Sequence, residues 1–538
     1  MRANDEIDCS SDDDNVFFNS DDEIIEKMIE NAVNEEKAEN RIEEVSRRVN
    51  RKDYSRGPKL RRGDDPWNSN YWLLNLADPR VSDPTSRSGK KFRRDFRIPH
   101  IIFLEIIEML KSTRDEYGNS EPIFNYPKRL ICGIVSIPLE IKVLCALRTL
   151  ASGLKFKDAA ELSGYMSESS ANLFFKQFNR LFRQHFAPLY IQILQGTDFE
   201  DAMHQYAMLG LPGCVGSIDA TFVPWDKCSA NLTNVCNGDK GSFSSTDNLV
   251  LQYNIIDLIM DIYIIFHYIG LGLLFEAVVT HSKQVVSVEG SYYATVNDKN
   301  TVKYSRFIGE LNNKEIYRDI SYKVRTGMRD DEFIELSDCY VIADGGYLEQ
   351  PATIAGYSGV STDPVKFKFT DWVASVRKDV ESFLGILKKR FIFFKNPITL
   401  QSRIDIDNAF YTACIIHNMI LKHDGLDKLW LDDRNMMPHD EDYPDDENVQ
   451  DDMSSYIPRI HDDATFVPRY VHMLIPHYEL SGGDCMKMEY EKLQKLLANH
   501  LQVMYRLGEL RWSKSRKEIK LIFNDGPREN FPDAGDLE

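Results

Sequence analysis

The chain has 538 residues, a formal net charge of −19 and 43% hydrophobic residues, and its length allows two to four domains with a sizeable core. Its nine cysteines form no C-x-x-C pair and no Cys/His zinc spacing, which argues against a disulfide framework and favours free thiols in a reducing compartment. Asp5, Glu6 and Asp8 stand where a secretory signal peptide would carry basic and then apolar residues, so we expect no signal peptide.

The negative charge is concentrated in two segments. Residues 1–50 carry 16 acidic and 6 basic side chains, and residues 426–465 carry 13 and 3, so each has a net charge of −10. We interpret both as solvated, disordered segments. Between residues 51 and 97 the sign reverses, with 13 basic and 6 acidic side chains. This density suits sequence-independent contacts with DNA phosphates, and a solvated basic linker or a nuclear import signal explains it equally well. The candidate phosphate contacts are Lys90, Lys91, Arg93 and Arg94.

Composition and periodicity divide the chain into six segments. They are an acidic arm at 1–60, a basic and mixed region at 61–130, a helical region at 131–200, a domain of mixed strands and helices at 205–425, an acidic linker at 426–465 and a helical tail at 466–538. The tail has leucines at helical spacing between Glu489 and Trp512, so we expect it to pack back on the body of the protein.

The region between residues 137 and 185 is helical by its apolar spacing. Pro138 suits a first helical turn, and Gly153 ends the helix that follows it. A short helix over 157–162 precedes Ser167, which suits the N-cap of a third helix. Two helices separated by a tight glycine-containing turn have the layout of a helix-turn-helix. Small helical bundles share this layout, so both DNA binding and plain packing remain open for it.

Residues 205–425 alternate β-type runs with long helices. This order predicts an α/β or α+β domain with one mixed sheet, preceded by the all-helical region. The predicted strands are Gly216–Val223, Asn248–Asn254, Gln284–Glu289 and Asp338–Ala343, and the predicted helices are Trp372–Phe391 and Ile404–Leu421.

Three acidic residues stand out by their context. Asp219 lies within a predicted strand, and Asp344 follows a buried apolar run and precedes two glycines, where sites open in such sheets. Glu381 flanks the apolar stripe of a helix, with Arg377 one turn before it. Three converging carboxylates repel one another unless a cation joins them. Mg²⁺ prefers such oxygen ligands and supports phosphoryl transfer, with Mn²⁺ as a possible substitute.

Several segments resemble the PIF/Harbinger family of DDE transposases, in the family's order. They are DPTSRSGKKFRRDFRIP (83–99), IPLEIKVLCALRTLASGLKFKDAAELSGYMSES (137–169), GCVGSIDATFVPW (213–225), VNDKNTVKY (296–304), YVIADGGY (340–347), VRKDVESFLGILKKRF (376–391) and ACIIHNMI (413–420). The resemblance covers roughly residues 67–425.

The resemblance implies an RNase H-like catalytic fold, a divalent metal and cut-and-paste transposition in the nucleus. It makes Asp219, Asp344 and Glu381 the catalytic and metal-binding triad. It also implies DNA as the substrate, both as transposon ends and as target, and a Myb-like partner protein; the oligomeric state stays open and includes a homo-oligomer. We interpret Asn297-Asp298 as a turn rather than a metal contact, and His417 as a satisfied core histidine.

Two alternatives remain open. The first is a domesticated, non-catalytic DNA-binding or adaptor protein, which an intact triad argues against without excluding. The second concerns the apolar run at 255–275, where the sequence departs from the family. The run is long enough to raise the question of a membrane span, but two aspartates and its place between two predicted strands argue against one. We expect instead an atypical insertion, contributed by a retained intron or by a real structural element.

Overall fold

The computed structural model describes most of the chain between residues 67 and 510. The described residues are 67, 70–115, 117–124, 135–164, 166–228, 232, 236, 271–294, 298–317, 320–359, 363–427 and 483–510. They all belong to one compact unit that begins at Leu60. The acidic arm and most of the acidic linker lie outside the described residues, so the expectations for them stay predictions.

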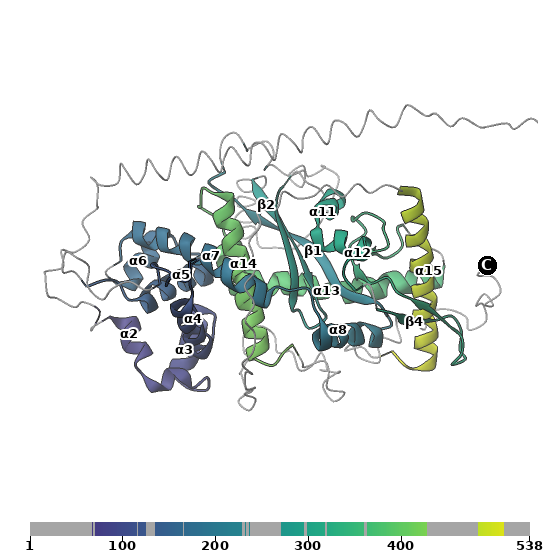
Figure 1. The fold of residues 1–538 in the computed structure, drawn as a ribbon, viewed down its shortest axis with the longest axis horizontal. Helices are drawn as coiled ribbons and strands as arrows, with labels where there is room; N and C mark the ends of the chain where they lie inside the picture. The colour runs from purple at the N-terminus through teal and green to yellow at the C-terminus, as the bar shows by residue number, and fades with distance from the viewer. Residues whose placement is uncertain are drawn as a thin grey trace, which may run out of the picture. The chain divides into compact units, whose positions relative to one another are not determined.

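The N-terminal part of this unit is helical, as the periodicity predicted (Figure 1). Its elements are α2 (Tyr71–Leu76), η2 (Pro79–Ser82), α3 (Arg87–Phe96), α4 (His100–Ser112), α5 (Leu139–Ser152), α6 (Phe156–Ser163) and α7 (Glu168–Tyr190). The predicted N-cap of α7 and the predicted end of α5 are both confirmed. The Ser167 side chain accepts a hydrogen bond from the backbone N–H of Ser170 and so caps α7. Gly153 ends α5 in a left-handed conformation (φ 62°) that glycine adopts without strain.

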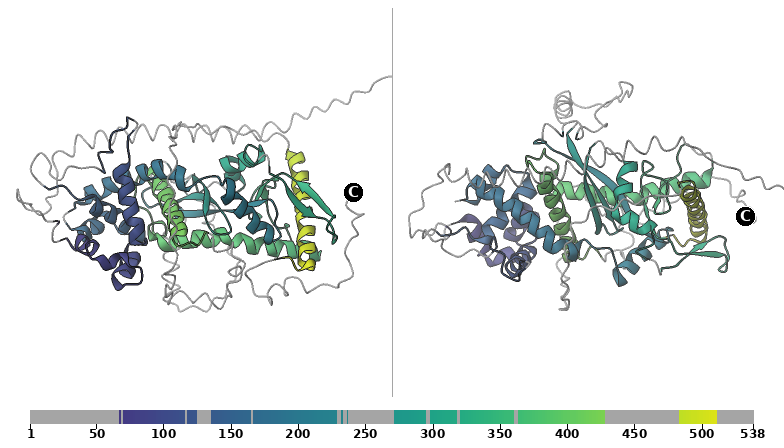
Figure 2. Two further views of the ribbon diagram at one scale, coloured as in Figure 1. Left: turned by 60° about the horizontal axis from the view of Figure 1, so that its bottom comes forward. Right: turned by 45° about the horizontal axis from the view of Figure 1, so that its top comes forward.

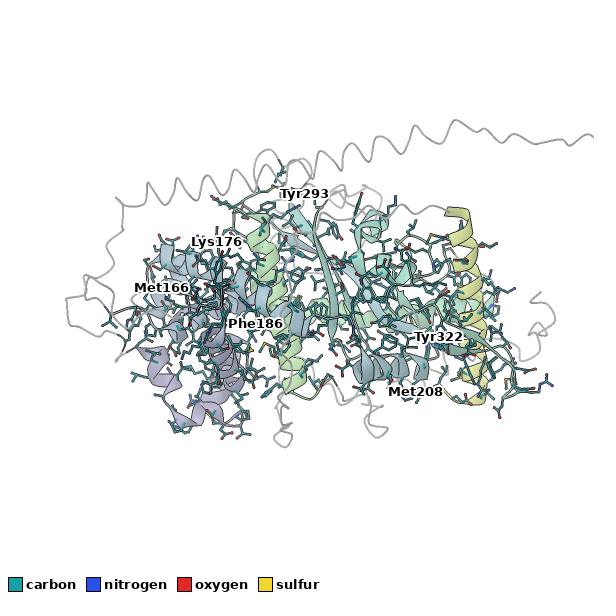
Figure 3. The ribbon with its side chains drawn as sticks, viewed as in Figure 1. Met166, Lys176, Phe186, Met208, Tyr293 and Tyr322 are labelled. Atoms are coloured by element: carbon teal, nitrogen blue, oxygen red, sulfur yellow. The ribbon has the colours of Figure 1, made fainter. Side chains whose placement is uncertain are left out.

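The longest helix of this region, α7, packs on α14 (Arg403–His423), which Figure 1 shows between α7 and the sheet. Lys176 of α7, labelled in Figure 3, forms a 2.7 Å ion pair with Asp405 of α14. The exposed first turn of α7 carries Glu168 and two serines and no basic side chain. α6 and α7 have the predicted layout of two helices joined by a tight turn, and the first turn of α7 carries no positive charge.

A mixed five-stranded sheet forms the centre of the rest of the unit, in the order β3-β2-β1-β6-β7. β1 pairs with β2 and β2 with β3 in antiparallel fashion, whereas β6 pairs in parallel with both β1 and β7. This mixed sheet confirms the predicted α/β class. The strands are β1 (Cys214–Pro224), β2 (Gly272–Val279), β3 (Val285–Tyr293), β6 (Tyr340–Ile342) and β7 (Thr353–Ile354), with a separate hairpin of β4 (Tyr322–Arg325) and β5 (Phe333–Leu336).

Helices cover both faces of the sheet. On one side Val215, Ile218 and Val341 pack against α8 (Gly196–Met208) and α12 (Arg306–Asn312). On the other side α13 (Pro364–Arg390) contacts β1 and β2, and α14 contacts β3. Figure 2 shows α13 running along the sheet towards α15. The remaining elements are α11 (Asp298–Tyr304), η5 (Ile392–Phe394) and α15 (Gly483–Leu507).

The C-terminal helix α15 completes the core of the sheet domain. Leu497 and Leu501 are almost fully buried and share one apolar cluster with Trp372 and Val376 of α13. The Gln494 amide donates a 2.8 Å hydrogen bond to the carbonyl of Ala355. On the neighbouring hairpin, Tyr322 lies beside α15 (Figure 3) and packs in a cluster with Leu496. The expectation that the tail packs back on the body is confirmed for this helix.

The last four residues of the run 255–275 are a real structural element, which was one of the two alternatives left open for it. Gly272 to Phe275 form the first half of β2 and pair with Thr221 to Pro224 of β1. A Cβ added at Gly272 would lie 2.2 Å from the Phe222 ring, so the close approach of β1 and β2 requires glycine at this position. Residues 255–270 lie outside the described residues. Within the described part of the chain, no helix is long and apolar enough to cross a membrane.

This boundary gives a deletion test of the insertion. Removing residues 255–270 should leave the domain folded and more soluble, because every described strand remains complete. Removing 255–275 should unfold it, because the deletion takes away half of a central strand. Circular dichroism melts of the two deletion variants measure the difference. If the shorter deletion also unfolds the domain, and sequenced transcripts always carry these codons, residues 255–270 are a structural element and not a retained intron.

Candidate active site

The register of the sheet brings Asp219 and Asp344 to neighbouring strands. Ser217 of β1 pairs in parallel with Ile342 of β6. Asp219 and Asp344 each lie two residues further along the chain from these partners, and both strands run in the same direction, so the two carboxylates lie at the same level of the sheet. Asp219 still lies within β1, whereas Asp344 lies in the turn that follows β6, where its Oδ1 accepts a 2.7 Å hydrogen bond from the Gly345 N–H.

Glu381 of α13 is joined to Asp219 by Arg377, which lies one turn before Glu381 on the same helix. Arg377 donates from Nη1 to Asp219 Oδ2 at 3.2 Å and from Nη2 to Glu381 Oε1 at 2.5 Å. The Arg377 side chain is only 16% exposed, whereas that of Glu381 is 45% exposed. A single guanidinium group therefore joins the carboxylate of a central strand to the carboxylate of the helix that covers it.

The electrostatic environment of Asp219 reflects this crowding. Burial raises the pKa of its carboxyl group above the usual value, and the negative charges of Glu381 and Asp344 raise it further. The Ala220 N–H, at 2.9 Å from Oδ1, and the Arg377 charge act in the opposite direction. Both other acids of the predicted triad thus act electrostatically on Asp219.

The donor set fits a hard divalent cation such as Mg²⁺ by its chemistry. It consists of three carboxylates, and two of them, Asp344 and Glu381, are exposed to solvent and so could share the cation with water and a phosphate group. The present spacing is not that of a loaded metal centre: within the described residues, no three Asp, Glu, His or Cys side chains are grouped closely enough to hold a metal ion. Arg377 supplies the positive charge between Asp219 and Glu381 instead.

Further polar residues near the triad were not predicted as site residues. Lys388 of α13 donates a 2.7 Å hydrogen bond to the carbonyl of Phe222 on β1, and burial lowers its pKa to about 8. Asp379, two residues before Glu381, pairs with His281 at 2.6 Å and with Lys283 at 3.4 Å, and so ties α13 to the turn between β2 and β3. The only indication in the sequence that Asp379 has a structural role was its position, as an acidic residue, next to the apolar stripe of α13.

His417 is a core histidine, as predicted. Its Nδ1 lies 3.1 Å from Arg390 Nη1 and its Nε2 lies 3.0 Å from the carbonyl oxygen of Lys283. Burial, together with the charge of Arg390, lowers its pKa to about 3, so the ring is neutral at physiological pH. Asp298 is the first residue of α11, and Asn297 lies outside the described residues.

The candidate DNA contacts all lie on α3, which is amphipathic. The buried face of α3 carries Phe92 and Phe96. The exposed residues Arg87, Lys90, Lys91 and Arg94 recur at steps of three, one and three residues, which places them on one face of the helix. We call these four residues the basic face of α3. Arg93 points elsewhere: its Nη2 lies 2.5 Å from Asp424 Oδ2, just after α14.

A comparison with known protein families matches part of the sheet domain to a nuclease family. Residues 267–418 match the model of the DDE superfamily endonuclease family. The match includes Asp344 and Glu381, lies after Asp219, and begins inside the apolar run of residues 255–275. It supports a DDE transposase family, a nuclease-type domain that acts on DNA and an RNase H-like fold for this part of the chain. No curated protein and no solved structure matches the chain.

Proposed function

We propose that this protein is a DDE transposase of the PIF/Harbinger type, a metal-dependent DNA endonuclease and strand transferase with Asp219, Asp344 and Glu381 as its catalytic residues. Two observations support the proposal: the parallel register of β1 and β6 sets Asp219 and Asp344 at the same level of the sheet, and the Arg377 bridge joins Asp219 to Glu381 of α13. The mixed strand order and the match over residues 267–418 support the RNase H-like fold.

The three carboxylates would hold the divalent ion, with Mg²⁺ as the proposed cofactor. When bound, such ions activate the attacking water or 3′-hydroxyl and stabilise the leaving oxygen of an in-line displacement at phosphorus. Asp219 is held by its place inside β1, and Glu381 by α13, whose buried residues anchor it to the sheet. Asp344 and Glu381 are exposed to solvent, so a bound DNA strand would have access to them.

The proposed substrate is DNA that carries the ends of the element. Inverted repeats beside the coding region in genomic DNA would supply its sequence. Incubating the purified full-length protein with such DNA in Mg²⁺ should yield nicks at the repeat boundary, and chelation with EDTA should abolish them. If no nick forms at any repeat with Mg²⁺ or Mn²⁺, the proposed activity is wrong.

We further propose that the basic face of α3 binds DNA phosphates. Changing Lys90, Lys91 and Arg94 together to Gln should weaken binding to all duplex sequences alike. It should also reduce the slope of log K against log salt by roughly 3, about one unit for each phosphate contact removed. Fluorescence anisotropy at several salt concentrations measures both quantities.

Arg93 on the same helix provides the matched control. Because it pairs with Asp424, Arg93→Gln should lower the stability of the α3–α14 contact and leave the salt slope nearly unchanged. If the triple variant binds DNA with unchanged affinity and slope, the basic face does not contact DNA, and the basic residues serve as a solvated linker or an import signal.

The nuclear location, the Myb-like partner and a homo-oligomeric state are further proposals that rest on the resemblance alone. A domesticated, non-catalytic role is the second candidate, and the Arg377 bridge favours it, because two of the three carboxylates already have a cationic partner. Binding of Mn²⁺ that depends on the triad separates the two candidates, since a non-catalytic adaptor does not require such a site.

A further inference from the structure

We propose that Arg377 is a displaceable internal cation that competes with the divalent metal for Asp219 and Glu381. This inference rests on the proposed metal-dependent function and concerns how the site is held before a metal ion enters. It follows from the contacts of one side chain and from the charges around it.

The contacts of Arg377 place its positive charge between the two carboxylates. Each of its two Nη atoms serves a different carboxylate, one on β1 and one on α13. Because the side chain is 16% exposed, solvent screens these ion pairs less than it screens pairs on the surface. Without Arg377, Asp219 and Glu381 would face each other and Asp344 with no positive charge between them.

The same contacts occupy atoms that a metal ion would use. Asp219 Oδ2 and Glu381 Oε1 accept from Arg377, and Asp219 Oδ1 accepts from the Ala220 N–H, so both oxygens of Asp219 have donors. A guanidinium group has no lone pair and cannot ligate a cation. Its charge repels a divalent ion at close range. The charge of Arg377 and its hold on Asp219 Oδ2 and Glu381 Oε1 therefore oppose metal binding through these two carboxylates, and the opposition is relieved when Arg377 releases at least one of them.

Competition of this kind lowers the apparent affinity for the metal, because the ion binds only the fraction of molecules in which the bridge is open. It also keeps the two carboxylates close together while no metal is bound. Arg377 is thus a positioning residue: it acts through Asp219 and Glu381 and is not itself proposed to ligate the metal.

The test measures metal binding rather than cleavage. In the full-length protein, Arg377→Gln should lower the dissociation constant for Mn²⁺, measured by calorimetry, by about tenfold. Without metal, the same variant should have a lower melting temperature than wild type. Saturating Mn²⁺ should raise the melting temperature of the variant by more than it raises that of wild type. Arg377→Lys keeps the charge but cannot bridge both carboxylates, so its dissociation constant should be intermediate; it serves also as the second variant if Arg377→Gln does not fold.

Two matched controls separate the bridge from general effects of charge. Lys378→Gln removes one positive charge from the next, exposed residue of α13, and Arg306→Gln removes a similar Arg–Glu pair at positions i and i+4 of α12. Both should leave the Mn²⁺ dissociation constant within about twofold of wild type. Lys378 is exposed and screened by solvent and salt, and Arg306 lies on α12, which packs on the face of the sheet opposite α13.

The outcomes distinguish this inference from the proposed function. Suppose that wild type binds Mn²⁺ and that Asp219→Asn does not. If Arg377→Gln then binds Mn²⁺ with unchanged or weaker affinity, only the proposed competition is wrong, and Arg377 instead orders the site or stabilises the fold. If wild type shows no binding that depends on the triad, the proposed metal-dependent function is wrong and the competition falls with it.

Discussion

Asp219→Asn, Asp344→Asn and Glu381→Gln should each reduce Mg²⁺-dependent cleavage of end-containing DNA by roughly a thousandfold or more, which corresponds to about 4 kcal/mol of activation free energy. Each substitution replaces a charged ligand with a neutral amide of nearly the same size. The metal then loses both a ligand and part of the negative charge that holds it. The fold should persist, because mutual repulsion falls and no core side chain is removed.

The control for this prediction is Asp371→Asn. Asp371 lies on α13 about three turns before Glu381, so the change alters charge on the same helix without touching the triad. Cleavage by this variant should stay within about twofold of wild type, as is usual for substitutions away from a site. Near-normal nicking by any of the three triad variants would show that the residue concerned is not a catalytic ligand.

Leu497→Ala should destabilise the sheet domain by roughly 2–5 kcal/mol, the range observed when a buried leucine is truncated. Leu497 is fully buried in the cluster that contains Trp372, Val376 and Tyr206, so its removal leaves a cavity between α15, α13 and α8. Deleting the chain from residue 483 onward should have a larger effect, because it exposes this whole cluster to water. Urea denaturation followed by circular dichroism measures the change in the free energy of unfolding.

The same helix offers a matched control in Met488, whose side chain is 66% exposed. Met488→Ala removes a comparable apolar volume and should change the free energy of unfolding by less than about 0.5 kcal/mol. If the chain without α15 unfolds with the midpoint of the full-length protein, α15 is not part of the folding unit. The packing of α15 on the core would then contribute nothing measurable to the free energy of unfolding.

The secondary-structure setting of the three candidate acids was predictable from local patterns: Asp219 lies within an apolar strand, Asp344 just after another, and Glu381 beside the apolar stripe of a helix. Their selection among 84 acidic residues depended on the family resemblance, and their catalytic role stays a prediction. The Arg377 bridge was not predictable in full. Its contact with Glu381 follows from helical spacing, but its contact with Asp219 joins residues 158 positions apart, and no local pattern encodes it.

The boundary of β2 was missed for a related reason. All eight residues of this strand are buried, because β2 lies between β1 and β3 and is covered on both faces. Such a strand shows no alternation of polar and apolar side chains, so its sequence reads like the apolar run before it. On α3, by contrast, helical spacing alone separates the basic face from Arg93. A helical projection of the sequence would have found that difference.

The central claim is that Asp219, Asp344 and Glu381 hold a divalent metal in a DDE nuclease site. Anomalous diffraction from crystals of the full-length protein soaked in Mn²⁺ tests this claim most directly. We expect a strong anomalous peak within ligand distance of the three carboxylates, and Arg377 moved away from at least one of its two partners. An empty triad at saturating Mn²⁺, with Arg377 still bridging Asp219 and Glu381, would contradict the account.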